Sequence, residues 1–211
     1  MMQSHQLKLS PNRLDPRIAR SEAAIQNALL EQLRSGRGFN SLTVSEIAEQ
    51  AGVTRKTFYA RFGSLEQLVE RMVLDLFSEI ESRMDDQMLI MPVMDNTLSM
   101  MVLKECEEHR AILAPLVRYC SASLFVEPLN EVLTRLLERI TGVNDTPKLV
   151  EVDQAYLVAT IASVIHGVLS VWVKRGFCDA PERIAKFADT LLVEGMQKVI
   201  LAGGIWSDSS A

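Results

Sequence analysis

The stretch from Leu42 to Met72 constrains the fold of this chain more than any other part of the sequence. It reads LTVSEIAEQAGVTRKTFYARFGSLEQLVERM and predicts two short helices joined by a tight turn, with a long helix after them. Thr43 and, three residues later, Glu46 form a capping box at the start of the first helix. Gly52 stands where the chain needs a positive φ, which glycine adopts without a Cβ clash. The stretch therefore predicts a helix-turn-helix unit.

The second short helix combines a buried face with a polar face that suits nucleic acid. Thr54 is placed to cap it, and Phe58 and Phe62 form its buried side. Small residues, Ala48 in the first helix and Gly52 at the turn, are expected to let the two helices cross closely. The polar face carries Arg55, Lys56, Thr57, Tyr59 and Arg61. A helix N-terminus attracts phosphate, and Arg and Lys read guanine edges. A solvated basic face is the alternative, but turn, caps and cluster together favour DNA binding.

Residues 17–72 resemble the N-terminal DNA-binding domain of TetR-family transcriptional regulators. The shared pattern is T-V-x-E-I-A-E-x-A-G-V-T-R-x-T-F-Y-x-x-F followed by a capped helix, and it covers about a quarter of the chain. The DNA-contacting residues that the resemblance implies are Thr43, Thr54, Arg55, Lys56, Thr57, Tyr59 and Arg61. By that resemblance, the threonines at the two helix starts bind phosphates and the next three residues face bases. The tyrosine reaches a backbone phosphate, and the last arginine lies at the far end of the contact.

One position departs from the pattern of the family. Many members carry a lysine two residues after the position of Gly63, where it touches phosphate, and this chain has Leu65 there. That phosphate contact is therefore lost, or Arg17 or Arg20 on the first helix replaces it.

The charge of the chain is divided unevenly along the sequence. The net charge of −5 argues at first against a nucleic-acid partner. Through Met72, however, there are ten Lys and Arg against seven Asp and Glu, whereas from Val73 onward there are twelve against twenty. The two parts thus carry +3 and −8, which puts the cationic surface on the motif. Because this excess is small, we expect binding through placed contacts and a moderate salt dependence.

The rest of the chain also shows helical periodicity, so we predict an all-α fold of about nine helices with no strand. The first is opened by Asp15-Pro16. The later ones are expected over 64–88, 95–108, 110–119, 126–140, 146–176 and 179–202, with a break at Ile90 to Met94 and a Thr146-Pro147 cap. The predicted organisation is a disordered arm (1–14), a three-helix helix-turn-helix domain (15–72), an α-helical ligand-binding and dimerisation domain (73–206) and a tail (207–211).

The last two predicted helices are long and apolar. An intramolecular core would explain this pattern, but so would a four-helix interface between two subunits. The resemblance favours the interface, since TetR-family proteins dimerise through their final two helices. Gly167, beside His166, would let a second helix approach closely. A dimer also fits DNA binding, because a twofold pair of recognition helices reads two half-sites.

The middle of the chain, residues 84–125, is rich in methionine and other adaptable side chains. Core packing is the simpler interpretation of any single methionine. The resemblance adds a small-molecule effector among these helices, of unknown identity. The side chains predicted to contact it are Met101, His109, Tyr119, His166 and Trp172.

Other classes of protein find little support in the sequence. The three cysteines have no CxxC spacing and the three histidines are far apart, so neither a metal site nor a cofactor is predicted. No nucleophile elbow, phosphate loop or HExxH motif occurs, which argues against an enzyme. Met1 to Asn12 lacks the apolar run of a secretion signal, and segment 161–172 is interrupted by polar residues and glycine. We therefore expect a cytoplasmic protein without a membrane span.

Together these features predict a ligand-responsive, DNA-binding transcriptional regulator, best explained as a repressor that binds a palindromic operator as a homodimer. The alternative is a helical protein-interaction adaptor that binds protein through its last helices and whose basic helix is incidental.

Overall fold

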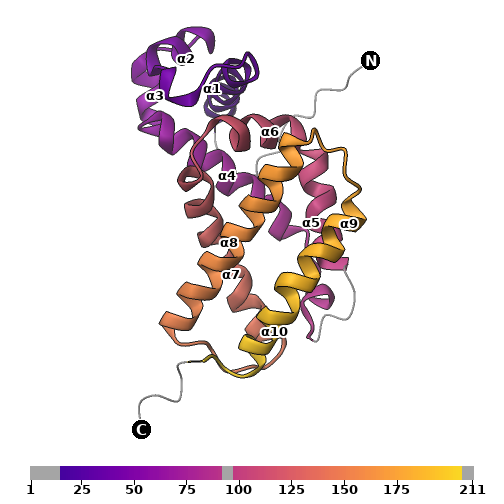
Figure 1. Cartoon of the computed structure of the whole chain (residues 1–211). Helices are drawn as coiled ribbons and strands as arrows, with labels where there is room; N and C mark the ends of the chain where they lie inside the picture. Colours follow the sequence, from indigo (N-terminus) through magenta and orange to yellow (C-terminus); the bar gives the residue numbers. More distant parts are fainter. Residues whose placement is uncertain (1–14, 92–96, 206–211) are drawn as a thin grey trace.

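Helices make up the fold throughout residues 15–91 and 97–205, which the computed structural model describes, and no strand occurs among them. A head formed by α1 (Pro16–Arg34), α2 (Val44–Gln50) and α3 (Arg55–Phe62) stands at one end of a larger helical body (Figure 1). The helix α4 (Leu65–Ser82) leads from the head into the body. The body contains α5 (Thr97–Glu108), α6 (Arg110–Tyr119), α7 (Ser123–Val143), α8 (Glu151–Lys174), α9 (Pro181–Ala188) and α10 (Glu194–Leu201). The all-α prediction is confirmed; the predicted arm (1–14) and tail (207–211) lie outside the described residues.

The head is built around the apolar stripe of α1. Asp15 caps this helix by accepting a hydrogen bond from the Arg17 N–H at 2.9 Å, and Pro16 is its first residue, as the sequence predicts. Leu29 and Leu33 of the stripe are fully buried. A short 3-10 turn, Phe39–Ser41, then returns the chain across the head. Its Phe39 side chain is buried, which ties the segment between α1 and α2 to the same core.

The helix α4 belongs to both parts of the molecule. Leu68 and Met72, in its first half, are buried with the head, and Leu76 and Ile80, further along, are buried with the body. In the body α4 packs along α7, and α7 packs along α8. The hydrophobic core is therefore continuous from the head into the body through one helix.

The helix α4 ends at Ser82, six residues before the predicted end at Met88. A long-range contact explains this difference. Arg139 of α7 donates Nη2 to the Met84 carbonyl at 2.5 Å and Nε to the Asp86 carboxylate at 2.6 Å. Asp85 then caps a separate 3-10 turn, Asp86–Leu89, by accepting from the Gln87 N–H. An arginine more than 50 residues away thus binds the carbonyl that a continuing helix would use.

Two other predicted boundaries in the body are wrong. The helix α7 begins at Ser123 rather than near Val126, which places Pro128 inside it. The helix α8 begins at Glu151, with Val150 as its cap, rather than at Thr146-Pro147. The Thr146 N–H donates instead to the Thr141 carbonyl at 3.1 Å, so this segment continues the turn after α7. The predicted break from Ile90 to Met94 falls largely on residues 92–96, outside the described ranges.

The predicted last helix is continuous but changes its hydrogen-bonding pattern halfway. A π-helical turn, Asp189–Val193, lies between α9 and α10 without an interruption in the chain of helical residues. Counted as one helix, these segments reduce the ten α-helices of the described ranges to the nine that the sequence predicts. The helix α6 has the predicted bounds, Arg110–Tyr119.

Candidate DNA interface and ligand cavity

The start of α2 has the predicted capping box. The Glu46 N–H donates to Thr43 Oγ1 at 3.3 Å, and the Thr43 N–H donates to Glu46 Oε2 at 2.9 Å. Arg37 adds an ion pair to the same carboxylate at 3.0 Å. The hydrogen bond from the Thr43 side chain, followed by that from Arg37, lowers the pKa of Glu46. The box therefore fixes the first turn of α2 while Thr43 itself stays exposed.

The turn between α2 and α3 depends on the backbone of Gly52. This residue has φ +66°, and the N–H of the next residue, Val53, donates to the Ala48 carbonyl at 2.9 Å. A Cβ added to Gly52 would meet no atom within 4 Å. The prediction that glycine is needed here for close helix crossing is thus wrong, since its φ alone requires it. Ala48, only 1% exposed, does lie in the packed interface.

The helix α3 presents its N-terminal turn to solvent. Thr54 Oγ1 accepts from the Thr57 N–H at 3.1 Å, and the two hydroxyl oxygens lie 2.9 Å apart. Phe58 is fully buried against the head and holds the helix in place. Arg55 and Lys56 are exposed on the outer side. The structure thus brings a helix N-terminus, of the kind that attracts phosphate, and two cations onto one open surface.

Tyr59 and Arg61, two further predicted DNA contacts, differ in how far they are exposed. Tyr59 is 47% exposed, and its ring lies edge-on to Phe58, so its hydroxyl points outward from a fixed base. Arg61 is instead half-buried in a groove between the head and α7. Its Nε is enclosed and has no hydrogen-bond partner within the described ranges. The geometry therefore separates Arg61 from the other six predicted residues.

Leu65, at the position where many family members carry lysine, is 8% exposed and belongs to the core of the head. Its side chain packs in this core and has neither a charge nor a hydrogen-bond donor for a phosphate. Arg17 and Arg20 are both exposed near the start of α1, so both are accessible for a replacement contact.

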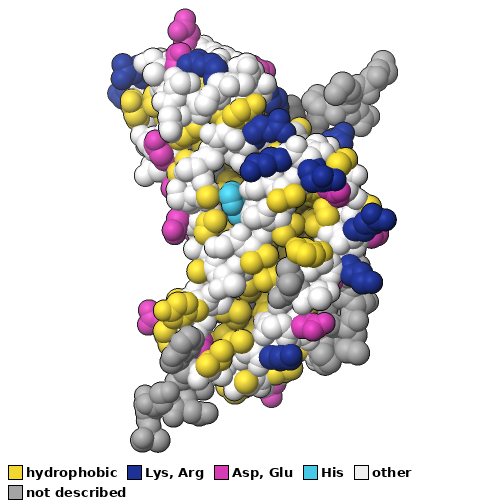
Figure 2. Space-filling view, viewed as in Figure 1, with side chains coloured by type: hydrophobic (Ala, Val, Ile, Leu, Met, Phe, Trp, Pro, Cys, Tyr) yellow, Lys and Arg dark blue, Asp and Glu magenta, His cyan; other side chains and the backbone are white. Residues whose placement is uncertain are grey.

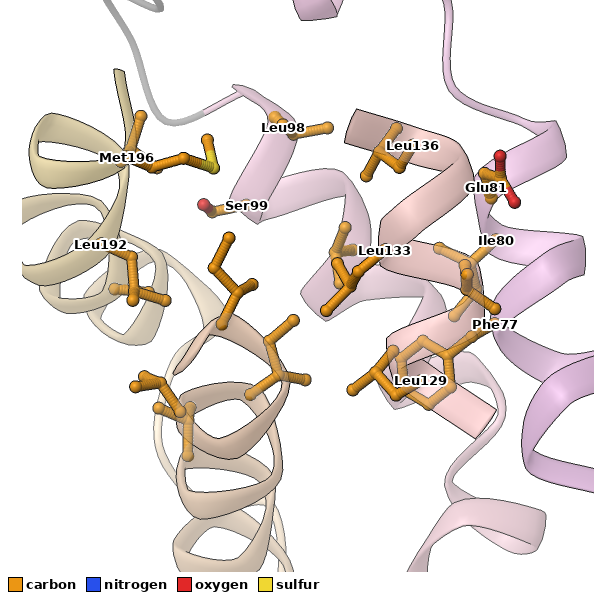
Figure 3. A pocket seen from close by; sticks show the side chains of 18 of the residues that line it. Phe77, Ile80, Glu81, Leu98, Ser99, Leu129, Leu133, Leu136, Leu192 and Met196 are labelled. Atoms are coloured by element: carbon orange, nitrogen blue, oxygen red, sulfur yellow. The ribbon is translucent and has the colours of Figure 1, made fainter. Parts of the chain in front are cut away.

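A cavity of about 160 Å³ lies in the body. Its walls come from α4, α5, α7, α8 and the helix that runs from α9 to α10. Figure 3 shows Leu129 and Leu133 of α7 facing Leu192 and Met196 of the last helix across this space. Among the described residues that line it, only Glu81 and Ser99 are neither apolar nor cysteine.

None of the five side chains predicted to contact a ligand lines this cavity, so the predicted set does not coincide with it. Trp172 is 1% exposed and donates Nε1–H to the Asp179 carbonyl at 3.0 Å. His109 bonds through Nδ1 to the Glu105 carbonyl at 2.9 Å. His166 packs on Phe125, with ring centroids 5.2 Å apart, and burial lowers its pKa. Met101 and Tyr119 are half-buried elsewhere in the body. The spacing of residues in the sequence does not show which side chains point into the cavity, so its lining could not be predicted from the sequence.

Two further properties bear on the class of protein. Within residues 15–91 and 97–205, no group of three or more His, Cys, Asp or Glu is arranged to hold a metal ion. One helix in these ranges, α8, has the length and composition to cross a membrane, with a mean hydropathy of 1.8 in its most apolar window. Only 28% of that window is buried within the chain. The outer face of α8 is therefore apolar and uncovered.

Comparison with known proteins gives consistent results. Residues 30–72 match the profile of a family described as bacterial regulatory proteins, tetR family. An uncharacterised HTH-type transcriptional regulator of Bacillus subtilis (strain 168), YxbF, is 25% identical over 195 residues. That alignment covers 89% of this chain and 49% of the relative, so the chain spans about half the length of the curated relative.

Solved structures share the fold over most of the chain. Lin0861 from Listeria innocua has a TM-score of 0.68 at 14% identity, covering 90% of this chain and 97% of the other. A TetR transcriptional regulator from Streptococcus agalactiae 2603V has a TM-score of 0.56 at 21% identity, with coverage of 83% and 95%. The likeness thus extends through the body as well as the head.

Proposed function

Because residues 30–72 match the profile of the bacterial regulatory proteins of the tetR family, we propose that this protein is a ligand-responsive transcriptional repressor that binds a palindromic operator as a homodimer. The observation that carries the proposal is the exposed first turn of α3, where Arg55 and Lys56 stand beside the capped helix N-terminus. Such an end attracts phosphate and places its side chains at base edges when it enters the major groove.

Each exposed residue of the site has a proposed role. Thr43 and Thr54, at the starts of α2 and α3, bind phosphates through hydroxyl and backbone N–H groups. Arg55, Lys56 and Thr57 face bases, since Arg and Lys suit guanine and threonine suits a thymine methyl. We expect the Tyr59 hydroxyl to reach a phosphate. Half-buried Arg61 is expected to contribute less than the exposed cations.

The proposed dimer forms through α8 and the last helix. Apolar side chains are exposed along both: Tyr156 (62%), Val171 (58%), Phe187 (58%) and Leu201 (53%). Figure 2 shows hydrophobic atoms along the face where these helices lie in Figure 1. Gly167 is exposed on α8, and a Cβ there would meet nothing within 4 Å, which leaves room for a second helix. An apolar patch of this kind marks an interaction surface, and a partner subunit accounts for the hydropathy of α8 without a membrane.

The cavity supplies a place for the effector between the helix that enters the head and the helices of the proposed interface. A ligand that binds better to one spacing of the two heads would shift the protein toward that spacing. We also propose that the protein is cytoplasmic and has no enzyme activity, because a regulator of this family acts on DNA.

Operator binding tests this function directly. DNA selected from genomic fragments with the purified protein supplies the site, and gel-shift titration at ~100 mM salt measures affinity, since specific complexes persist there. We expect Arg55→Ala with Lys56→Ala to weaken specific binding by at least 100-fold, because each base contact contributes about 1–3 kcal/mol. Circular dichroism and sedimentation of the variant should match those of the parent.

The control variant is Lys104→Ala, which removes an exposed cation from α5 in the body. Its operator affinity should stay within about threefold of the parent. Sequence-specific binding that survives the double substitution would contradict the proposed interface. A protein that selects no DNA but still dimerises would instead support the adaptor hypothesis.

A further inference from the structure

We propose that the effector which occupies the cavity is a small, uncharged, hydrocarbon-like molecule of about the size of benzene, and that anions are excluded. This inference rests on the proposed function, because it names the chemical class of the effector. The composition, the engaged polar groups and the size of the cavity each support it.

The lining is almost entirely carbon. Phe77 and Ile80 come from α4, Leu133 from α7, and Leu192 and Met196 from the last helix (Figure 3). The thiol of Cys106, which also lines the cavity, stays protonated, because burial raises its pKa to about 12. Surfaces of this kind give apolar ligands a favourable transfer from water and offer polar ligands nothing in return.

The two polar lining residues are already engaged with protein groups. Ser99 donates its hydroxyl proton to the Asp189 carboxylate of the π-helical turn. Glu81, at the edge of the cluster in Figure 3, accepts from Arg135 Nη2 at 3.2 Å. Arg135 donates from the same nitrogen to Ser78 Oγ at 2.8 Å. The described lining therefore offers an entering carboxylate no unused hydrogen-bond donor except the weak S–H donor of Cys106.

Loss of hydration opposes the entry of any charged group. The described lining residues include no Lys, Arg or His, and their one carboxylate, that of Glu81, is already paired with Arg135. An anion in this space would lose its hydration and meet no cation in the lining, and an ammonium would meet no unpaired carboxylate there. An uncharged ligand meets none of these penalties.

The volume limits the size of the ligand. A cavity of about 160 Å³ is close to the roughly 150 Å³ of an engineered cavity lined by Leu, Ile and Phe that stays dry and binds benzene. Sites for drug-sized ligands are larger, about 300–1,000 Å³. The space therefore fits one aromatic ring or a short aliphatic chain and excludes a long acyl chain unless the helices move apart.

The test compares molecules of matched size that differ in charge. The purified protein, residues 1–211, is titrated by calorimetry with toluene and hexane, with benzoate and hexanoate, and with hexylammonium. We expect the two uncharged molecules to bind with Kd below about 1 mM, within the ligand-efficiency limit for so few atoms, and the charged ones at least 100-fold more weakly. Binding of hexanoate or hexylammonium as tight as that of hexane would overturn the inference. Failure of both hydrocarbons to bind would overturn it as well.

Filling the cavity supplies the matched variants. Val102→Phe and Ala188→Leu both add volume at the lining, from α5 and from α9. Either should weaken hydrocarbon binding by at least tenfold, whereas Val150→Phe, an exposed position outside the cavity, should leave it unchanged. If one of the two cavity-filling variants fails to fold, the other variant and the comparison of charged with uncharged ligands still test the inference. Operator binding of the ligand-free parent is measured separately, so a failure of DNA recognition is distinguishable from a failure of this inference.

Discussion

Gly52 shows at the scale of a single residue what the site requires of the backbone. Its φ is +66° and the space around it is open, so only the conformation resists a larger residue. We expect Gly52→Ala to lower the free energy of unfolding by about 1–2 kcal/mol, the cost of the left-handed region for a residue with a Cβ. Gly52→Asn should lose less, because asparagine tolerates this region. Urea denaturation measures both.

Gly142 is the control for this substitution. It lies in the last turn of α7, has no positive φ, and a Cβ there would also meet nothing within 4 Å. Gly142→Ala should therefore be neutral or stabilising by up to about 1 kcal/mol. Equal losses at positions 52 and 142 would show that backbone conformation is not what makes glycine necessary at the turn.

His166 makes stability depend on pH. Burial lowers its pKa in the folded protein below the unfolded value, so the unfolded chain binds the proton more readily. The free energy of unfolding should therefore fall as pH decreases from about 6.5 toward the lower folded pKa. Because the side chain is partly exposed, we expect an effect well under about 1 kcal/mol.

The variant His166→Gln isolates this contribution. Denaturation at pH 7.5 and pH 5.5 should show a smaller difference for the variant than for the parent. A difference of the same size in both proteins would mean that other groups produce the pH dependence.

Single residues also show where sequence reasoning succeeds and where it does not. Thr43, Thr54 and Ser64 all accept the cap hydrogen bonds that their local sequence predicts, because capping involves only neighbours within three residues. The side chains predicted to contact a ligand are polar, aromatic or flexible. Trp172 and His109 are instead satisfied by nearby carbonyls, and the cavity is lined by aliphatic side chains from five parts of the chain.

At the scale of elements, the same distinction separates predictable from unpredictable boundaries. The helices α2 and α3 begin where their threonine caps predict, whereas α4 stops early because Arg139, distant in sequence, binds the Met84 carbonyl beyond its last turn. A local pattern carries no information about such a partner. The existence of the helices was thus predictable, whereas several of their ends depend on contacts between residues far apart in the sequence.

The helix α6 also joins the head to the body through a carbonyl that its own proline leaves unpaired. Pro115 has no N–H to donate to the Ala111 carbonyl four residues earlier, and Arg34 at the end of α1 donates Nη2 to that oxygen at 2.6 Å. We expect Arg34→Gln to lower the free energy of unfolding by roughly 0.5–1.5 kcal/mol, the usual net value of one hydrogen bond. Thermal denaturation followed by circular dichroism measures the change.

Arg20→Gln is the comparison for this contact, since it removes an exposed arginine from the same helix. Its effect should stay within about 0.5 kcal/mol, as for ordinary surface substitutions. If both variants lose equal stability, the arginine–carbonyl bond does not join head and body.

At the scale of the whole molecule, the division of charge limits how much salt affects DNA binding. The first 72 residues carry a net charge of only +3, and in the proposed interface Thr43, Thr54 and Tyr59 contact phosphate without charge. Even if Arg55 and Lys56 of two subunits each neutralise one phosphate besides facing bases, the dependence of log K on log salt should have a slope no steeper than about −4, at roughly −0.9 for each phosphate neutralised. Titrations between 50 and 200 mM salt measure it; a slope near −8 would require cations beyond the proposed set.

The proposed subunit interface can be tested by substitution. Val171→Asp, on the exposed face of α8, should convert the proposed dimer to a folded monomer, because the carboxylate would be buried without a partner. Sedimentation velocity measures the oligomeric state. Ile90→Asp changes an exposed apolar side chain that belongs to neither α8 nor the last helix, and it should leave the dimer unchanged. A dimer that persists with Asp at position 171 would place the interface elsewhere.

The helix α4, which belongs to both head and body, would transmit movement between them as a rigid body. Its 18 residues span about 27 Å at 1.5 Å per residue, with Leu68 held in the head core and Ile80 at the cavity wall. A tilt of about 5° at one end therefore displaces the other by roughly 2 Å over that length. A tilt of this size on effector binding would therefore move the proposed recognition helix, α3, by roughly 2 Å relative to the DNA groove. Stiffness, rather than a chain of specific contacts, would carry the signal.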